Sequence, residues 1–328
     1  MENIEEFKKF IEKEKTLKEI CEKFNIDELT ACSVISKLKL DGNNIISQKN
    51  GDTILYINMG IKLLNGKNTY KIDMDKSKNV KVLVVSDTRF GSLFSQPTIL
   101  SDAYEKAYKY GCKFALHAGN MTEGLYSKSS PYYGDLFINY SSGQVDSAVK
   151  DYPYIENFNT YFIGGQRDIT HKKGKEGVDV CRAISQERSD LIYLGDSRCS
   201  IGLFNSKILL FSPIMKFKQP YQISYKLQNK IKSIRSEDKC DILLMGGLTN
   251  LDHVNQRNID SYQIPGMVAA TTKMENDDVQ PVIGYWILDL YFDDKGNLIK
   301  TIPLYSVYYN DIHNDIHPKI LKIGEMKK

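Results

Sequence analysis

Polar and charged residues follow the apolar runs of this 328-residue chain at points where predicted strands end. The run VLVV at 82–85 leads into Ser86, Asp87, Thr88 and Arg89. Open α/β sheets place their sites at the carboxyl ends of strands, so a carboxylate here predicts a functional loop. Arg89 stands where a metal site would need an imidazole. The loop is therefore an active centre, a damaged one or an unrelated turn.

Later loops of the same kind follow other predicted strands. The relevant positions are Asn120 in HAGN, Gln166, Arg167 and Asp168 in GGQRD, Ser212 in LLFSP, and Gly247 and Thr249 in LLMGGLTN. Because the carboxyl ends of neighbouring strands meet at one edge of a sheet, we expect these loops to form one site.

Alternating strands and helices must position these loops from residue 80 onward. The apolar runs predict strands at 81–86, 114–118, 160–164, 191–195, 200–204, 207–212 and 241–246, with helices near 98–110, 143–150, 177–187 and 222–235. After residue 259 the pattern predicts strands alone, with DDKGN as a hairpin turn. The fold class expected is an α/β sandwich with mixed sheets over residues 80–310.

Residues 1–58 carry the pattern of three short helices and a hairpin, an order that resembles a winged helix-turn-helix. Thr16 and Glu19 make a capping box. The third helix is expected to turn Leu29, Ala31, Val34, Ile35 and Leu38 inward. The pair Asn50-Gly51 predicts the hairpin turn. Residues 59–79 are polar and lysine-rich and are predicted to be a linker, and residues 311–328 a tail.

If this module binds DNA, its third helix would present Thr30, Ser33 and Lys37 to the groove. The hairpin would offer Lys49 and Asn50 to the backbone. Residues 1–60 hold nine lysines and eleven acidic residues, so charge does not favour DNA. A protein-pairing module is the alternative.

Composition excludes several classes of protein. Forty-four basic against 41 acidic side chains give a net charge of +3, too small to indicate a nucleic-acid partner by itself. The six cysteines form no C-x-x-C pair and indicate reduced core thiols. No apolar run reaches the roughly 18 residues that span a bilayer. We expect a cytoplasmic protein without a membrane partner.

With the loops assembled, the chain resembles the calcineurin-like metallophosphoesterases over roughly residues 80–308, most closely a phage-associated group that carries an N-terminal winged helix. YLGD at 193–196 and YQISYKLQNKI at 221–231 belong to this resemblance. The family's loops read Asp-x-His, Gly-Asp, Gly-Asn-His-Asp, a lone His, and Gly-His-x-His. Aligned residue by residue, the positions of the family's metal ligands hold Asp87, Arg89, Asn120, Gln166, Ser212, Gly247 and Thr249. Arg167 stands at the His of the third loop, and Asp168 is retained beside it.

The resemblance therefore implies a site that has lost its metal ligands. Guanidinium groups have donors only and stay protonated, so Arg89 and Arg167 cannot coordinate a cation. We predict neither metal nor other cofactor, and no enzymatic activity. The hypothesis for the site is that Arg89 or Arg167 fills the metal position and pairs with Asp87 and Asp168. A rival hypothesis is that the arginines hold a phosphate or nucleotide without catalysis.

The sequence offers three further groups of candidate residues: one histidine after a predicted strand, two histidines near the C-terminus and two lysines on a predicted helix. His117 is expected to be a core histidine. His313 and His317 with Asp311 and Asp315 could chelate a metal, although a solvated tail is the simpler interpretation. Lys226 and Lys230 are predicted to lie four apart on the outward face of a helix, where they could contact a partner or a nucleic-acid backbone.

Phage proteins similar to this group serve as recombination directionality factors, which bind a large serine integrase on DNA. The resemblance thus implies a pseudoenzyme that acts in DNA recombination by protein–protein and DNA contacts. Two alternatives stay open: a divergent metal-dependent phosphodiesterase or nuclease, and a DNA-binding regulator that acts alone.

Overall fold

The chain divides into two compact units, Met1–Asn68 and Thr69–Lys328, in a computed structural model. The structure describes residues 4–13, 15–40, 43–50, 53–61, 69–74, 78–172, 177–213, 224–310 and 315. Each unit has its own hydrophobic core and is described by itself.

The first unit contains three helices and a small sheet. Its elements are α1 (Ile4–Phe10), β1 (Lys15–Thr16), α2 (Leu17–Phe24), α3 (Glu28–Leu40), β2 (Asn43–Asn50) and β3 (Thr53–Ile61), with strand order β1-β3-β2. The predicted capping box at the start of α2 is present, because Glu19 N donates to Thr16 Oγ1 at 3.1 Å and Thr16 N donates to Glu19 Oε2 at 2.7 Å.

Two details of this unit differ from the prediction. Leu29 is 84% exposed, not inward, because the buried stripe of α3 runs through Ala31, Ile35 and Leu38 and Leu29 lies two residues, about 200°, from Ala31. The second detail is the hairpin: Asn50, predicted to be in the turn, is the last residue of β2 and pairs with Thr53. The other residue of the predicted turn, Gly51, lies outside the described residues.

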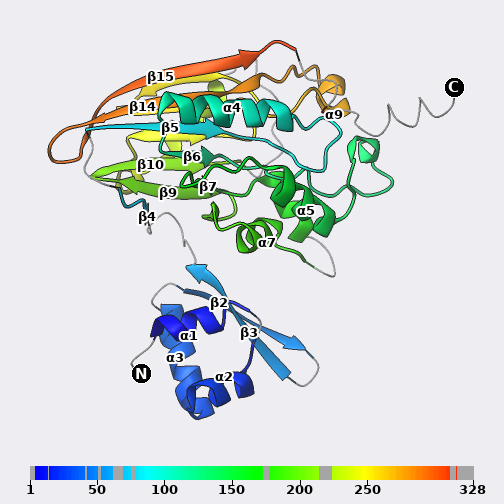
Figure 1. Cartoon of the computed structure of the whole chain (residues 1–328), viewed down its shortest axis with the longest axis vertical. Helices are drawn as coiled ribbons and strands as arrows, with labels where there is room; N and C mark the ends of the chain where they lie inside the picture. The colour runs from blue at the N-terminus through cyan, green and yellow to red at the C-terminus, as the bar shows by residue number, and fades with distance from the viewer. Residues whose placement is uncertain are drawn as a thin grey trace. The chain divides into compact units, whose positions relative to one another are not determined.

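The second unit is an α/β sandwich of two mixed six-stranded sheets, which confirms the predicted fold class (Figure 1). The first sheet has the order β15-β14-β5-β6-β7-β8 and the second β12-β13-β11-β10-β9-β4. The strands are β4 (Thr69–Lys71), β5 (Asn79–Val85), β6 (Phe114–His117), β7 (Thr160–Phe162), β8 (Leu191–Tyr193), β9 (Arg198–Leu203), β10 (Ser206–Phe211), β11 (Ile242–Met245), β12 (Asp252–Gln256), β13 (Ile259–Gln263), β14 (Ile283–Phe292) and β15 (Leu298–Tyr308).

The helices of this unit are α4 (Pro97–Tyr110), α5 (Ser141–Asp151), α6 (Gln166–Ile169), α7 (Val180–Glu187), α8 (Tyr225–Ser233) and α9 (Thr272–Asn276), with 3-10 turns at Tyr133–Asp135, Thr170–Lys172 and Ser236–Asp238. The outer faces of the sheets are covered by α4, α5 and α7 on one side and by α8 on the other. Leu83 and Val85 of β5 share a core with α4, α5 and α7, whereas Leu243 of β11 packs against α8. Figure 1 shows α4 lying across β5 and β14.

The inner faces of the two sheets pack on each other. Strand side chains alternate in direction, so Val82 and Val84, both buried, point away from the helices that Leu83 and Val85 contact. Trp286 Nε1 of β14 donates to the Gln263 carbonyl at the end of β13 at 2.9 Å, which joins one sheet to the other. This packing holds the carboxyl ends of β5, β6, β7, β10 and β11 in one region.

Two predictions need correction, the linker and the region after residue 259. Residues 69–71 of the predicted linker form β4, which pairs in parallel with β9, and in the first unit residues 59–61 continue β3. The region after 259 is not strands alone, because α9 begins behind Thr271, whose side chain accepts from Met274 N. The remaining linker residues 62–68 and 75–77 and the tail, apart from Asp315, lie outside the described residues.

Candidate functional site

The loops after β5 and β6 run side by side and bring the predicted site residues together. Asp87 N donates to the Gly119 carbonyl at 2.9 Å, and Arg89 N donates to the Asn120 carbonyl at 3.1 Å. Asp87, Arg89, Asn120 and Thr249 all have positive φ, between 47° and 58°. For a residue other than glycine, this left-handed conformation costs roughly 1 kcal/mol or more. The surrounding contacts must therefore hold the loops in place.

Asp87 is the centre of these contacts and is fully buried. Its Oδ1 accepts from Arg89 Nε at 3.2 Å and Nη2 at 3.1 Å, and from Asn120 Nδ2 at 2.9 Å. Its Oδ2 accepts from Ser86 Oγ and from the Gly247 backbone N–H, each at 2.9 Å. The loops after β5, β6 and β11 are thus tied together through one carboxylate.

Glu123 was missed by the sequence analysis and completes the charge balance. Its carboxylate is 1% exposed and lies 3.2 Å from Arg167 Nη1 and 3.9 Å from Arg89 Nη1. Tyr126 Oη also donates to Glu123 Oε1 at 2.6 Å. Burial opposes the charge on Arg89, but the carboxylates of Glu123 and Asp87 raise its pKa above the ordinary value. Burial lowers the pKa of Arg167, with Glu123 opposing that shift.

Asp168 does not pair with either arginine, which corrects half of the pairing hypothesis. Its two oxygens accept from the backbone N–H groups of Met121, Thr122 and Gly165 and from Thr122 Oγ1, at 2.7 to 3.2 Å. Burial raises its pKa to about 6, and these donors oppose the shift. Asp168 therefore fastens the loop after β6 to the start of α6, a role that a motif-based interpretation does not reveal.

The other predicted positions lie around this network. Asn120 Oδ1 accepts from Arg167 N at 3.0 Å, so its amide bridges Asp87 to α6. Thr249 donates its hydroxyl to the neighbouring Leu248 carbonyl and is buried. Ser212 is also buried, and its Oγ has no hydrogen-bond partner among the described residues. A Cβ added to Gly247 would come within 3.1 Å of that Oγ, which places Ser212 beside the Asp87 network.

His117 is a core histidine with a fixed tautomer. Its Nδ1 accepts from Gly119 N at 3.3 Å, so Nε2 carries the proton and donates to Thr88 Oγ1 at 3.2 Å. Burial lowers the pKa of His117 to about 4, and burial also lowers the pKa of His171 to about 4. His171 bridges the hydroxyls of Thr122 and Ser141. Both rings are therefore neutral parts of the scaffold at pH 7.

The side chains at the site do not fit the dinuclear metal centre that the family resemblance implies. The Arg89 guanidinium occupies one side of Asp87, and the Asn120 amide nitrogen donates to the same carboxylate. The oxygens of Asp168 accept hydrogen bonds from backbone N–H groups. Among the described ranges, no three His, Cys, Asp or Glu side chains gather closely enough to hold a metal ion. No step of a metal-dependent mechanism can be built on these residues.

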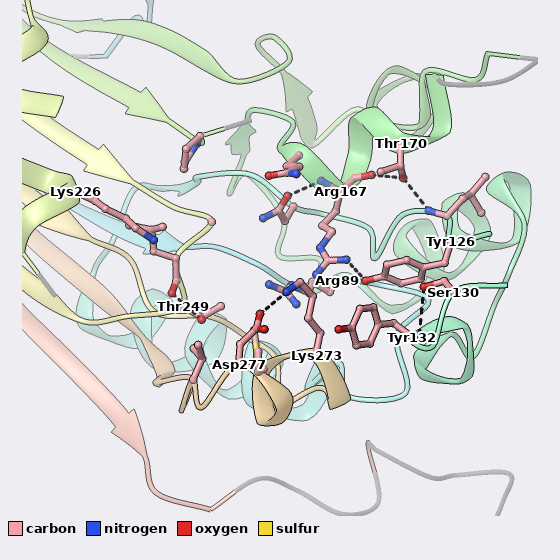
Figure 2. Close-up of a pocket in the computed structure, with 18 residues that line it drawn as sticks. Arg89, Tyr126, Ser130, Tyr132, Arg167, Thr170, Lys226, Thr249, Lys273 and Asp277 are labelled. Atoms are coloured by element: carbon pink, nitrogen blue, oxygen red, sulfur yellow. Dashed lines mark hydrogen bonds and ion pairs between the residues drawn. The ribbon is translucent and has the colours of Figure 1, made fainter. Parts of the chain in front are cut away.

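A pocket of about 650 Å³ opens above the network (Figure 2). Arg89, Arg167, Lys226 and Lys273 line it together with one acid, Asp277. The remaining lining residues are Asn120, Leu125, Tyr126, Ser130, Tyr132, Gln166, Thr170, Pro213, Gly247, Leu248, Thr249, Met274 and Val279. Figure 2 shows the side chains of Arg89, from the loop after β5, and Arg167, from α6, with Tyr126 and Tyr132 beside them.

The two lysines of α8 are not on an outward face, contrary to the prediction. Lys226 lines the pocket, and burial lowers its pKa. Lys230 Nζ lies 3.7 Å from the centre of the Phe211 ring, and burial also lowers its pKa. Leu227 and Ile231 supply the buried stripe as expected. The helix tilts both lysines over the second sheet, which the helical spacing alone could not establish.

The remaining predicted residues fall in other parts of the chain. Thr30, Ser33 and Lys37 are all exposed on α3. Lys49 and Asn50 lie in β2, and their side chains are outside the described part of the structure. Asp315 accepts from Thr98 N at 3.0 Å and Thr98 Oγ1 at 2.6 Å, so it caps α4. Asp311, His313 and His317 lie outside the described residues.

Comparison with known proteins gives matches only among solved structures. No family model and no curated protein matches the chain. An archaeal phosphodiesterase is 13% identical, with a TM-score of 0.37 over 69% of this chain and 100% of its own. Vacuolar protein sorting 29 from Cryptosporidium parvum is 15% identical, with a TM-score of 0.35 over 71% and 100%. A putative 5′-nucleotidase from Staphylococcus aureus is 11% identical, with a TM-score of 0.39 over 75% and 58%.

Proposed function

We propose that this chain is a divergent phosphoesterase-like protein that works by binding and not by catalysis, as a regulatory factor in a DNA transaction. One observation carries the proposal: the buried Asp87 carboxylate is held by the Arg89 guanidinium at 3.1 and 3.2 Å. A cation already neutralises this carboxylate, and it is a cation that cannot activate water.

Neither the two buried histidines of this region nor Asp168 is placed for general base catalysis. His117 and His171 are buried, their pKa values lie near 4, and hydroxyl partners fix both rings. Asp168 accepts four hydrogen bonds from the loop that it holds. A general base must reach the proton that it removes, and these groups face the scaffold.

The specific role we propose is that of a recombination directionality factor whose partners are a serine integrase and DNA, in the cytoplasm. Support comes from the resemblance to phage proteins with this role and from the first unit, a proposed winged helix. Its α3 exposes Thr30, Ser33 and Lys37. Polar side chains on an exposed helix can read base edges, although the balanced charge of the unit offers little backbone attraction.

Metal analysis with a phosphodiesterase assay tests the non-catalytic part. For a site without metal ligands we expect the purified protein to contain transition metal at about 0.1 mol per mol or less. We also expect no Mn²⁺-dependent hydrolysis of bis(p-nitrophenyl) phosphate. Stoichiometric metal together with turnover that Asp87→Ala abolishes would show a working phosphodiesterase instead.

Gel shifts test the partner. DNA carrying the integrase attachment site should shift with the chain only when the integrase is present, and the triple substitution of Thr30, Ser33 and Lys37 by alanine should weaken that complex if α3 contacts DNA. Tight binding of the chain alone would favour the DNA-binding regulator. A complex with integrase that the triple variant leaves unchanged would assign α3 no part in DNA contact.

A further inference from the structure

The pocket above the Asp87 network collects cationic side chains from four separate segments. Arg89 follows β5, Arg167 lies in α6, Lys226 in α8 and Lys273 in α9. These segments are far apart in the sequence, from residue 89 to residue 273. The four positive charges that they place in one pocket repel one another, which costs free energy. Asp277, which pairs with Lys273, is the acidic residue among the lining residues that the structure describes.

The acids beneath the pocket do not use all of the arginine donors. Asp87 takes Nε and Nη2 of Arg89, and the buried Nη1 has no hydrogen-bond partner among the described residues. Glu123 faces both guanidiniums but lies 3.9 Å from that Nη1, beyond hydrogen-bond distance. Glu123 Oε2 also has no hydrogen-bond partner among the described residues, so the charge of Arg89 is balanced below the pocket by only one hydrogen-bonded carboxylate, that of Asp87.

The shape and the lining narrow the class of ligand. A volume of about 650 Å³ falls in the range of roughly 300 to 1,000 Å³ typical of small-molecule sites. Paired guanidiniums match the oxygens of a phosphate, which carries more charge and more acceptors than a carboxylate. Tyr126 and Tyr132 line the same pocket with ring centres 6.5 Å apart, with Arg167 over the Tyr126 ring and Lys273 over the Tyr132 ring, so aromatic and cationic groups lie together in the pocket.

We propose that this pocket binds a 5′-nucleotide phosphate without a metal ion, the phosphate lying between Arg89 and Arg167 and the base toward Tyr126 and Tyr132. The inference rests on the proposed function only in taking the site to be non-catalytic. The same phosphate chemistry has two sources, a free nucleotide and the 5′ end of a DNA strand.

Isothermal titration of the full-length chain in EDTA tests the proposal. The probes are AMP, adenosine, and a single-stranded twelve-nucleotide DNA with and without a 5′ phosphate. We expect AMP to bind and adenosine not to bind. If only the 5′-phosphorylated strand binds, the proposal stands and the source is a strand end. Equal binding of the phosphorylated and unphosphorylated probes, or binding of none, overturns it.

Two substitutions with opposite expected effects on affinity test whether the phosphate binds at Arg89 and Arg167. Arg167→Gln should weaken binding at least ~10-fold, the value of a hydrogen bond to a charged group. Glu123→Gln removes the acid below both guanidiniums and keeps its shape, so it should tighten binding several-fold, on the order of 3-fold. Lys109→Gln, on the exposed face of α4, is the matched control and should change nothing. Unchanged affinity in both pocket variants overturns the proposal.

The buried variants can fail to fold, so a variant of a more exposed side chain in the same pocket is also needed. The Lys273 side chain is 39% exposed, pairs with its helical neighbour Asp277 and lies over the Tyr132 ring, so Lys273→Gln should fold normally and weaken binding about 3-fold. Chromatography of AMP incubated with the chain and Mn²⁺, without EDTA, separates the two proposals. AMP that binds and is converted to adenosine refutes the non-catalytic function and keeps the phosphate site, whereas no binding and no conversion refutes only the phosphate site.

Discussion

Removal of the Arg89 side chain should destabilise the second unit through the Asp87 charge that it leaves behind. Methionine is the appropriate replacement because it has similar length and no charge. Arg89 has a φ of 47°, so glycine would relieve backbone strain and hide part of the effect. Arg89→Met removes two hydrogen bonds from a carboxylate that is fully buried.

The structure sets the size of the expected effect. Breaking a buried ion pair by removing one partner costs roughly 3 to 5 kcal/mol. Asp87 keeps three neutral donors, from Ser86, Asn120 and Gly247, so the lower end of that range applies. For a unit of this size about 3 kcal/mol corresponds to a fall in Tm of roughly 6 to 12 °C.

The assay can isolate the second unit because the chain has one tryptophan. Trp286 is buried in β14, so its fluorescence in urea reports the unfolding of that unit and not of Met1–Asn68. The matched control is Lys109→Gln, which removes an exposed ion pair on α4 worth about 0.5 kcal/mol or less.

A double-mutant cycle decides whether the lost stability comes from the ion pair. Asp87→Asn combined with Arg89→Met removes both charges, so the double variant should be more stable than the sum of the single effects predicts, by about 2 kcal/mol. Additive effects, or a midpoint of Arg89→Met equal to that of Lys109→Gln, would refute the idea that Arg89 stabilises the unit by neutralising Asp87.

Three further predictions use the same measurement of unfolding free energy. His117 and His171 have folded pKa values near 4 and ordinary values near 6.5, so the unfolded chain takes up protons first and stability should fall from pH 6.5 to 4, by up to about 3 kcal/mol for each. Asp168, with a raised pKa of about 6, opposes this trend between about pH 4 and 6, and a stability that rises on acidification would show that it dominates. Gly247→Ala should cost about 1 to 2 kcal/mol because its φ is +77°, whereas the control Gly134→Ala, with nothing within 4 Å of its added Cβ, should be near neutral. Thr16→Ala should lower the stability of the first unit by about 1 kcal/mol in circular dichroism and leave the Trp286 transition unchanged; a shift in that transition would mean that the two units unfold together.

Much of the fold could be predicted because its elements have strong local patterns. The runs that became β5, β6, β10 and β11 are apolar and end at polar loops, and the α4, α5, α7 and α8 patterns repeat at helical spacing. Short elements without such patterns were missed: β4 lies in a polar segment of three residues, and α9 has five residues. Their formation depends on pairing with β9 and on the Thr271 cap, which are tertiary and local contacts that periodicity does not report.

The sequence predicted that these loops would lie together, but it did not predict most of the ion pairs and hydrogen bonds between their side chains. Asp87 and Arg89 are two residues apart, and their contact was expected from charge. Glu123 lies in a loop without period, and only its burial beneath two guanidiniums shows its role. Lys273 and Tyr132 come from segments that sequence reasoning did not connect to the site. An acid three residues beyond Asn120 was the signal available, but it could not be distinguished from a solvated one.

Two buried acids hold the loops of the candidate site in their conformation. Asp87 accepts hydrogen bonds from three separate loops, and Asp168 joins the loop after β6 to the start of α6. These loops contain several residues with left-handed φ, so their conformation depends on these hydrogen bonds. A buried Asp87 also requires a positive charge nearby, and Arg89 supplies it from the same loop. The loop geometry therefore depends on side chains of the protein itself, and the Arg89→Met variant tests that dependence directly.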